Sequence, residues 1–134
     1  MKFPGTALLI DDEPHIRKFV SLILKKLGGS RILEASNGQE GVDLYRTERP
    51  ELVLLDVNMP GMTGLETLRQ LREINPDVVA VMLTSLANRQ TVDEAIELGA
   101  AHYIRKDSTK EEIAAALSET IERCFGDPTE EPSS

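Results

Sequence analysis

Three short runs of consecutive apolar residues constrain the fold of this chain more than any other feature. They span residues 7–10, 52–55 and 78–83, and within them apolar and polar residues do not alternate. A strand is uniformly apolar when helices cover both faces of its sheet, which is typical of parallel sheets. Residues 31–35 and 101–105 are strand-like but include polar side chains, so we expect them at the two edges of the sheet.

Helical patterns of apolar residues separate these runs. In residues 16–27, apolar side chains recur at steps of three and four residues, and Gly28-Gly29 then ends the pattern. Three shorter helices are predicted over residues 38–48, 65–74 and 92–98, and a longer one follows residue 108. Five strands that alternate with five helices predict one doubly wound α/β domain, because parallel neighbours need right-handed crossover connections.

The expected sheet is flavodoxin-like with the strand order 2-1-3-4-5, because the apolar strands should be central and the polar second and fifth strands outside. In this order a crevice forms at the carboxyl ends of the first and third strands. We expect the domain to cover residues 1–125. Residues 126–134 are acidic and contain prolines, so we expect a disordered tail or the start of a linker there.

Spacing along the chain also predicts details of the last two helices. The fifth helix should begin at a capping box formed by Ser108 and Glu111, and it should bury a face that includes Cys124. In the fourth helix, Ala95 and Ile96 are expected on the apolar face. Because Cys124 is the only cysteine, the chain has no internal disulfide and requires no oxidising compartment.

Charge and hydropathy argue against several classes of protein. The 134 residues include 23 acidic and 15 basic ones, and the net charge of -8 disfavours direct binding to nucleic acid or to an anionic membrane. No apolar stretch reaches the roughly 18 residues of a membrane span, and residues 1–5 lack the long apolar segment of a signal peptide. We therefore expect a cytoplasmic protein that is not bound to a membrane.

Polar residues follow the strands at the end where the crevice is predicted. Asp11 and Asp12 follow the first strand and Asp56 the third, while Thr84 and Lys106 follow the fourth and fifth strands. Each alone has an ordinary explanation as a helix cap, a turn or a surface residue, but those explanations do not predict that all five converge. Carboxylates at close range repel one another unless a cation compensates, and their oxygens suit Mg²⁺ or Mn²⁺.

Of the three acids, Asp56 is best placed to act as a nucleophile toward phosphorus, which would form an aspartyl phosphate. Phosphoryl transfer depends mainly on positioning and on neutralising the charge of the equatorial oxygens. A divalent cation, Lys106 and the Thr84 hydroxyl could neutralise that charge together. The formal charges of the three carboxylates, the lysine and the divalent ion add up to zero.

Four segments of the sequence resemble the receiver domains of bacterial response regulators in two-component signalling, and in particular the chemotaxis-type single-domain regulators. They are Leu8-Leu9-Ile10-Asp11-Asp12-Glu13, the segment LVLLDVNMPGMTG at residues 52–64, Met82-Leu83-Thr84-Ser85, and Tyr103-Ile104-Arg105-Lys106. The match covers about residues 6–124, and the segments occur in the family's order and spacing.

The resemblance implies that Asp56 is the phosphoacceptor and that a sensor histidine kinase or a histidine phosphotransfer protein supplies the phosphoryl group. It also implies that Mg²⁺ is bound by Asp12, by Asp56 and by the backbone carbonyl of Asn58, with Asp11 acting through a bound water. The domain would then be a signalling switch. It would catalyse nothing beyond its own phosphorylation and dephosphorylation.

The resemblance further implies how the signal leaves the site. Thr84 and Lys106 would contact the phosphoryl group, and Tyr103 would be the switch residue whose orientation follows Thr84. Output to a downstream protein would leave by the face that the fourth helix, the fifth strand and the fifth helix form.

Two positions depart from the family's usual pattern. Asp107 stands where the family usually has proline, so we predict a trans bond between Lys106 and Asp107, because a cis bond there costs about 2.5 to 4 kcal/mol. The Asp107 carboxylate either competes for the charge of Lys106 or only leads into the next helix. Gly41 stands where alanine is more common, and it should weaken the second helix by about 1 kcal/mol.

Three other functions fit parts of this pattern. A hydrolase of the haloacid-dehalogenase kind would need an acid two residues after the nucleophile, where this chain has Asn58. A flavin-binding module would need a phosphate-binding loop after the first strand, where Asp11 and Asp12 would repel phosphate. A docking module that works without phosphorylation is compatible with the sequence, although the complete set of acids, threonine and lysine argues against it.

Overall fold

The computed structural model describes residues 5–28, 31–57, 59, 61–84 and 89–125. Its centre is a five-stranded parallel sheet in the order β2-β1-β3-β4-β5. The strands are β1 (Thr6–Ile10), β2 (Arg31–Ala35), β3 (Leu52–Asp56), β4 (Val79–Thr84) and β5 (His102–Arg105). The predicted doubly wound, flavodoxin-like fold is therefore confirmed. The expectations for Asn58 and for a disordered tail at 126–134 fall outside the described residues.

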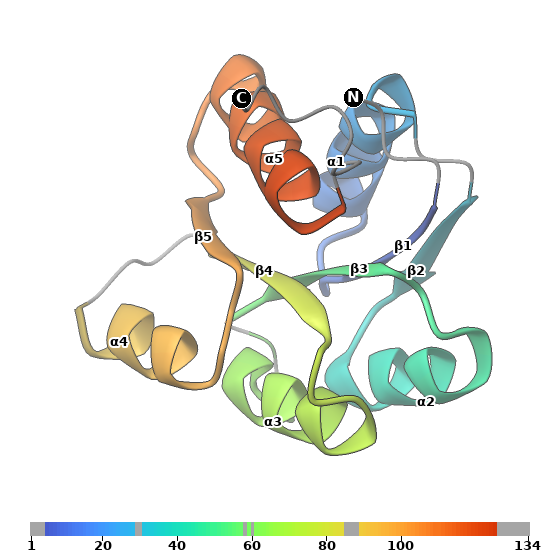
Figure 1. Ribbon diagram of the computed structural model, residues 1–134, viewed down its shortest axis with the longest axis vertical. Coiled ribbons are helices and arrows are strands. Elements are labelled where there is room, and N and C mark those ends of the chain that lie inside the picture. The colour runs from blue at the N-terminus through green and yellow to red at the C-terminus, as the bar shows by residue number, and fades with distance from the viewer. Residues whose placement is uncertain (1–4, 29–30, 58, 60, 85–88, 126–134) are drawn as a thin grey trace, which may run out of the picture.

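Helices cover both faces of the sheet (Figure 1). They are α1 (Pro14–Lys26), α2 (Gly38–Glu48), α3 (Gly64–Ile74), α4 (Arg89–Glu97) and α5 (Lys110–Phe125). Figure 1 shows α1 and α5 on one face, and α2, α3 and α4 on the other. Among the described residues, no helix is both long and apolar enough to span a membrane.

Successive residues of the central strands pack against opposite helix layers. In β3, for example, Leu52 and Leu54 belong to the apolar cluster that includes α1 and α5 residues, whereas Val53 and Leu55 belong to the cluster on the other side. All five β3 residues are buried. A strand with two buried faces must be apolar throughout, which explains why the runs seen in the sequence do not alternate.

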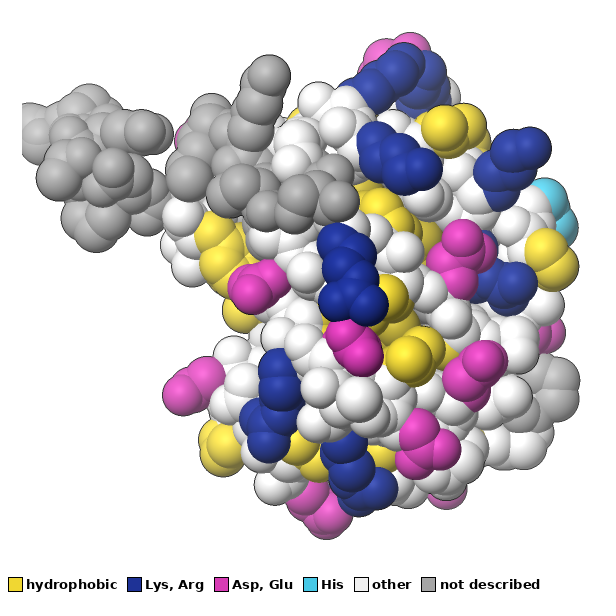
Figure 2. All heavy atoms as spheres, turned by 90° about the vertical axis from the view of Figure 1, so that its right-hand side faces the viewer, with side chains coloured by type: hydrophobic (Ala, Val, Ile, Leu, Met, Phe, Trp, Pro, Cys, Tyr) yellow, Lys and Arg dark blue, Asp and Glu magenta, His cyan; other side chains and the backbone are white. Residues whose placement is uncertain are grey.

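The two edge strands are the less buried ones, as predicted from their polar residues. At the β2 edge, Arg31 Nη1 lies 2.8 Å from Glu48 Oε1, and Arg17 Nε lies 2.9 Å from Glu34 Oε1. Figure 2 views the side of the molecule that lies at the right in Figure 1, and it shows Lys and Arg side chains interspersed with Asp and Glu. Charges along an exposed edge oppose pairing with another strand.

Side-chain caps fix where three of the helices begin. Asn37 Oδ1 accepts from the Glu40 backbone N–H before α2, and Thr63 and Glu66 form a reciprocal capping box at α3. The box predicted at Ser108 and Glu111 was placed one residue too early. Before α5, Thr109 accepts from the Glu112 N–H at 3.1 Å, and Glu112 accepts from the Thr109 N–H at 2.8 Å. The predicted pair and the observed pair have the same spacing of three residues, so the sequence could not show which of the two forms the box.

Two predictions about buried side chains were wrong. Ile96 is 63% exposed, because the buried residue of α4 is Ala95 and the next residue points about 100° away around the helix. Cys124 is also exposed. The last turn of α5 contacts the core through Phe125, which lies four residues after the buried Ile121.

Gly41 allows a close approach between α2 and β1. A Cβ atom at position 41 would lie 2.7 Å from Cγ1 of Ile10 and closer still to its Cδ1. Such a contact is shorter than real Cβ atoms make, so a larger residue at position 41 would force the Ile10 side chain or the helix to shift. Glycine has a low helix propensity, but at position 41 it allows α2 to pack closely on the sheet.

Candidate functional site at the carboxyl ends of the strands

The predicted site residues meet at one edge of the sheet. Asp11 directly follows β1, Asp56 and Thr84 are the last residues of β3 and β4, and Lys106 directly follows β5. Because parallel strands end at the same edge, their terminal residues are brought side by side. One edge of the sheet thus brings together side chains that are far apart in the sequence, at positions 11, 56, 84 and 106.

The hydrogen-bond ladder of the sheet continues past the strand ends into this site. The Asp11 N–H donates to the Ala35 carbonyl at 3.0 Å, and the Lys106 N–H donates to the Thr84 carbonyl at 2.7 Å. The N–H of Val57, the residue after Asp56, donates to the Leu83 carbonyl at 3.2 Å. The backbone beside each of these side chains is therefore held by a neighbouring strand.

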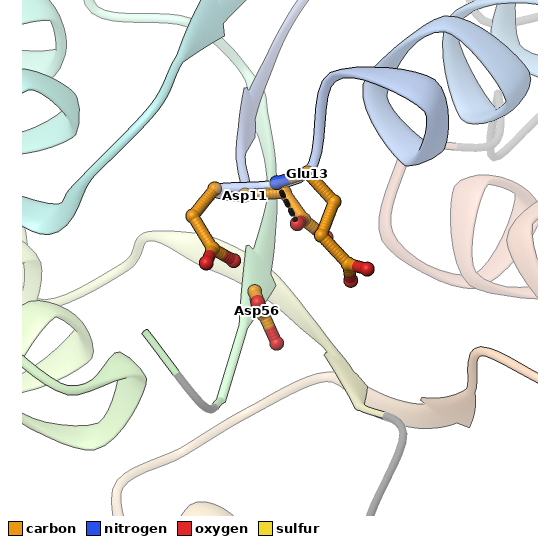
Figure 3. Close-up of side chains that lie close together, drawn as sticks. Asp11, Glu13 and Asp56 are labelled. Atoms are coloured by element: carbon orange, nitrogen blue, oxygen red, sulfur yellow. Dashed lines mark hydrogen bonds between the residues drawn. The ribbon is translucent and has the colours of Figure 1, made fainter. Parts of the chain in front are cut away.

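Four carboxylates form the acidic part of the site. One oxygen from each of Asp11, Asp12, Glu13 and Asp56 lies within 4.8 Å of the others. Figure 3 shows Asp11, Glu13 and Asp56 close together beside the ends of β1 and β3. Asp11 and Asp56 are buried, whereas Asp12 is exposed, so the cluster opens to solvent on the Asp12 side.

Lys106 is the cation of this cluster. Its Nζ lies 2.7 Å from Glu13 Oε1, 2.8 Å from Asp11 Oδ2 and 3.2 Å from Asp56 Oδ2. Only 7% of its side chain is exposed. A buried ammonium surrounded by carboxylates is the arrangement in which an ion pair can offset the loss of hydration.

The ion pairs change the proton affinities of both partners. Burial by itself lowers the pKa of Lys106, but the contacts with Asp11 and Glu13 and the charge of Asp56 outweigh it, and the net pKa is raised. The pKa of Glu13 is lowered, chiefly by its hydrogen bond with Lys106. Both shifts favour the charged forms, so the ion pair persists across the neutral range.

The loop that carries the first two acids is held by its own hydrogen bonds. The Glu13 N–H donates to Asp11 Oδ1 at 2.9 Å, which Figure 3 marks. Arg17 Nη1 donates to the Asp11 carbonyl at 2.6 Å, and its Nε donates to Glu34 on β2. The sequence alone predicts no role for Glu13 or Arg17. Their only signal in the sequence is their position beside Asp11 and Asp12 at the start of α1.

A hydroxyl pair lies on the β4 and β5 side of the site. Thr84 is fully buried, and its hydroxyl hydrogen-bonds with that of Tyr103. Burial raises the pKa of Tyr103, and the hydrogen bond with Thr84 opposes this shift in part. Tyr103 is partly buried and packs against the apolar cluster beneath α2, α3 and α4.

Asp107 does not take part in the acidic cluster. Its carboxylate accepts two hydrogen bonds from Arg105, from Nε at 3.1 Å and from Nη2 at 2.8 Å. It is therefore paired with Arg105 and leaves Lys106 to the other acids. The described residues contain no cis peptide bond, so the bond between Lys106 and Asp107 is trans, as predicted.

The donor set fits a small, hard divalent cation. Asp11 Oδ2 is buried and lies 2.8 Å from Lys106 Nζ, and the same ammonium also serves Glu13 and Asp56. A cluster that holds more carboxylates than cations is stabilised by a further cation. Carboxylate oxygens open to water on one side are what Mg²⁺ and Mn²⁺ prefer.

Comparisons with known proteins agree with this geometry. The "Response regulator receiver domain" family matches residues 7–118. The chain is 40% identical over 115 residues to the nitrate/nitrite response regulator protein NarL of Escherichia coli, covering 85% of this chain and 53% of NarL. It thus spans about half the length of that relative.

Shorter proteins match over nearly their whole length. The chain is 30% identical over 114 residues to the chemotaxis protein CheY of Bacillus subtilis, covering 85% of this chain and 95% of CheY. Among solved structures, the CheX-CheY-BeF3-Mg complex of Borrelia burgdorferi matches with a TM-score of 0.83 and 25% identity, covering 89% of this chain and 90% of that one. From the family match, the shared strand order and these relatives, we conclude that the chain belongs to the response regulator receiver domain family of two-component signalling.

Proposed function

We propose that this domain is a phosphorylation switch in which Asp56 accepts a phosphoryl group from a histidine kinase or a histidine phosphotransfer protein in the cytoplasm. The observation that carries the proposal is the position of Asp56. Its buried carboxylate ends β3 beside the Lys106 ammonium and within a cluster of three further acids. A carboxylate is a competent nucleophile toward phosphorus when cations neutralise the charge that gathers around it.

The acids divide into different roles in this proposal. Asp12 and Asp56, together with the Asn58 backbone carbonyl, would hold Mg²⁺ or Mn²⁺. Asp11 would act through a water, since one of its oxygens already accepts from the Glu13 N–H. The bound ion would supply positive charge for the phosphoryl oxygens. The similar CheX-CheY complex likewise contains BeF3 and Mg²⁺. Lys106 and the Thr84 hydroxyl would contact the same oxygens.

The proposed reaction is a simple one. An Asp56 oxygen forms a bond to phosphorus as the bond between phosphorus and the donor's histidine nitrogen breaks, and the nitrogen keeps the electron pair. The buried backbone of β3 fixes the direction of the carboxylate. A docking module that needs no phosphorylation gives the ion pairs of Lys106 no chemical role. Incubation with a phosphodonor distinguishes the two functions.

Incubation with a small phosphodonor such as acetyl phosphate and Mg²⁺ is expected to add one phosphoryl group, visible as a single shift in intact mass. Asp56→Asn should abolish the adduct, and so should excess chelator. Asp43→Asn, which changes an exposed acid on α2, is the matched control and should react like the wild type. An unchanged adduct in Asp56→Asn would show that another residue is the acceptor.

We further propose that the signal leaves through Thr84 and Tyr103 toward the face of α4, β5 and α5. The hydrogen bond between the two hydroxyls already joins the site to β5, and Tyr103 lies on that strand. If the Thr84 hydroxyl moves to a phosphoryl oxygen, Tyr103 loses this partner. The population of conformations at that face would then shift.

Thr84→Ala is accordingly expected to keep phosphorylation at Asp56 but to reduce the response of Tyr103 at least threefold. The readout is the change in amide exchange of residues 89–115 when beryllofluoride is added with Mg²⁺. Thr84→Ser retains the hydroxyl and is the control that should restore the response. A full response in Thr84→Ala would mean that output leaves the site by a different route.

A further inference from the structure

Three carboxylates already share the ammonium of Lys106 in this structure. An ammonium has three N–H donors, and three carboxylates, from Asp11, Glu13 and Asp56, surround it within 3.2 Å. A phosphoryl group on Asp56 brings further negatively charged oxygens to the same ammonium. It therefore competes with the present partners for the donors of Lys106.

The exposure of the three acids indicates which one leaves. The side chains of Asp11 and Asp56 are 5% and 2% exposed, and removing Lys106 from either would take a compensating cation away from a buried charge. The Glu13 side chain is 43% exposed, so its carboxylate can return to water at little cost. Of the three carboxylates, only that of Glu13 can thus be rehydrated at little cost.

Neighbouring contacts also favour the release of Glu13. It occupies the N-cap position of α1, yet its side chain makes no cap hydrogen bond, so the helix does not require that carboxylate in its present place. The second carboxylate oxygen, Oε2, lies 3.8 Å from Nε2 of the exposed His15. The released side chain therefore has a polar neighbour at the surface.

We propose that Glu13 is a positioning residue that holds Lys106 in the unphosphorylated domain and is displaced from it by the phosphoryl group. The inference rests on the proposed function of Asp56. With Glu13 in place, four carboxylates outweigh Lys106 and a divalent ion by one negative charge. An arriving phosphoryl group must overcome both this charge and the Glu13 hydrogen bond with Lys106.

The test compares the wild type, Glu13→Gln and Asp107→Asn. The first variant keeps the shape of the side chain but removes the charge that binds Lys106. The second removes the same charge one residue from Lys106, where the carboxylate is paired with Arg105 instead. Mg²⁺ affinity is measured first by calorimetry, and beryllofluoride, as the phosphoryl mimic, is then titrated at saturating Mg²⁺.

Glu13→Gln is expected to bind beryllofluoride about three- to fivefold more tightly, the size of effect that a half-exposed ion pair gives. Asp107→Asn should match the wild type. In chelator, without any ion, the NMR signal of the Lys106 ammonium should change in Glu13→Gln and stay unchanged in Asp107→Asn. This second readout reports on the contact itself.

Three results would overturn the inference. Weaker Mg²⁺ binding by Glu13→Gln without a gain for beryllofluoride would mean that Glu13 serves the cation. An equal gain in both variants would mean that only long-range charge matters. Failure of the wild type itself to bind beryllofluoride would instead refute the proposed role of Asp56, and the wild-type curve alone reveals that case.

Discussion

Gly64→Ala is expected to lower the free energy of unfolding by about 3 kcal/mol, at the upper end of what overpacking in a buried site costs. A Cβ atom at position 64 would lie 2.6 Å from the Cα of Val57 and closer still to the Asp56 carbonyl oxygen. These atoms belong to the backbone, so no side-chain rotation relieves the overlap. The start of α3 would have to move away from β3, and with it the hydrogen bond from the Gly64 N–H to the Val57 carbonyl.

Urea denaturation followed by circular dichroism measures this loss. Gly61→Ala is the matched control, because its Cβ would meet open space and only its positive φ of 77° opposes the substitution. That control should cost about 1 to 2 kcal/mol. Since the displaced backbone carries Asp56, Gly64→Ala should also weaken Mg²⁺ binding. Equal stability losses in the two variants would rule out a special contact at Gly64.

Lys106→Met is expected to lower the free energy of unfolding by about 3 kcal/mol at pH 7 in the presence of chelator. Methionine keeps most of the length of the side chain but leaves Asp11 and Asp56 buried without this cation. A divalent ion replaces part of the lost positive charge, so Mg²⁺ should stabilise the variant more than it stabilises the wild type. Lys18→Met, at an exposed position of α1, is the control and should change stability little.

The difference between Lys106→Met and the wild type should also depend on pH. The pKa of Lys106 is raised, so its contribution is present below the unfolded value of about 10.4 and is lost as the pH rises through the folded value. The pKa of Glu13 is lowered, so its contribution is present above about 4.3 and is lost as the pH falls through the folded value. Denaturation should therefore show the largest difference between roughly pH 5 and 10. A constant difference at every pH would argue against the ion pairs as its cause.

Most of the fold could be predicted from the sequence because the polarity of the residues in each strand indicates how deeply that strand is buried. The run at 52–55 is apolar throughout since both faces of β3 are covered, and the polar residues of β2 and β5 lie at edges. Once the strand order is known, Asp56 and Lys106 must meet, because parallel strands end together. This reasoning needs no knowledge of side-chain conformations.

Features that depend on the conformation of individual side chains could not be predicted in the same way. Nothing in the spacing of Glu13 and Lys106, 93 residues apart, shows that their side chains form an ion pair. The tight contacts at Gly41 and Gly64 depend on how closely a helix approaches a strand, which is a property of the packed structure. Cys124 was misplaced because Phe125, not Cys124, is the residue that reaches the core.

The extension of the sheet ladder past the strand ends has a consequence for the entropy of ligand capture. Fixing one residue of a flexible loop costs about 1 to 2 kcal/mol, which a ligand that orders the loop must supply from its own binding energy. Here the backbones at Asp11, Val57 and Lys106 are already fixed by neighbouring strands before any ligand arrives. An ion or anion that binds between them therefore does not have to order the backbone at these three positions. Its remaining binding energy is free to shift conformations elsewhere in the domain.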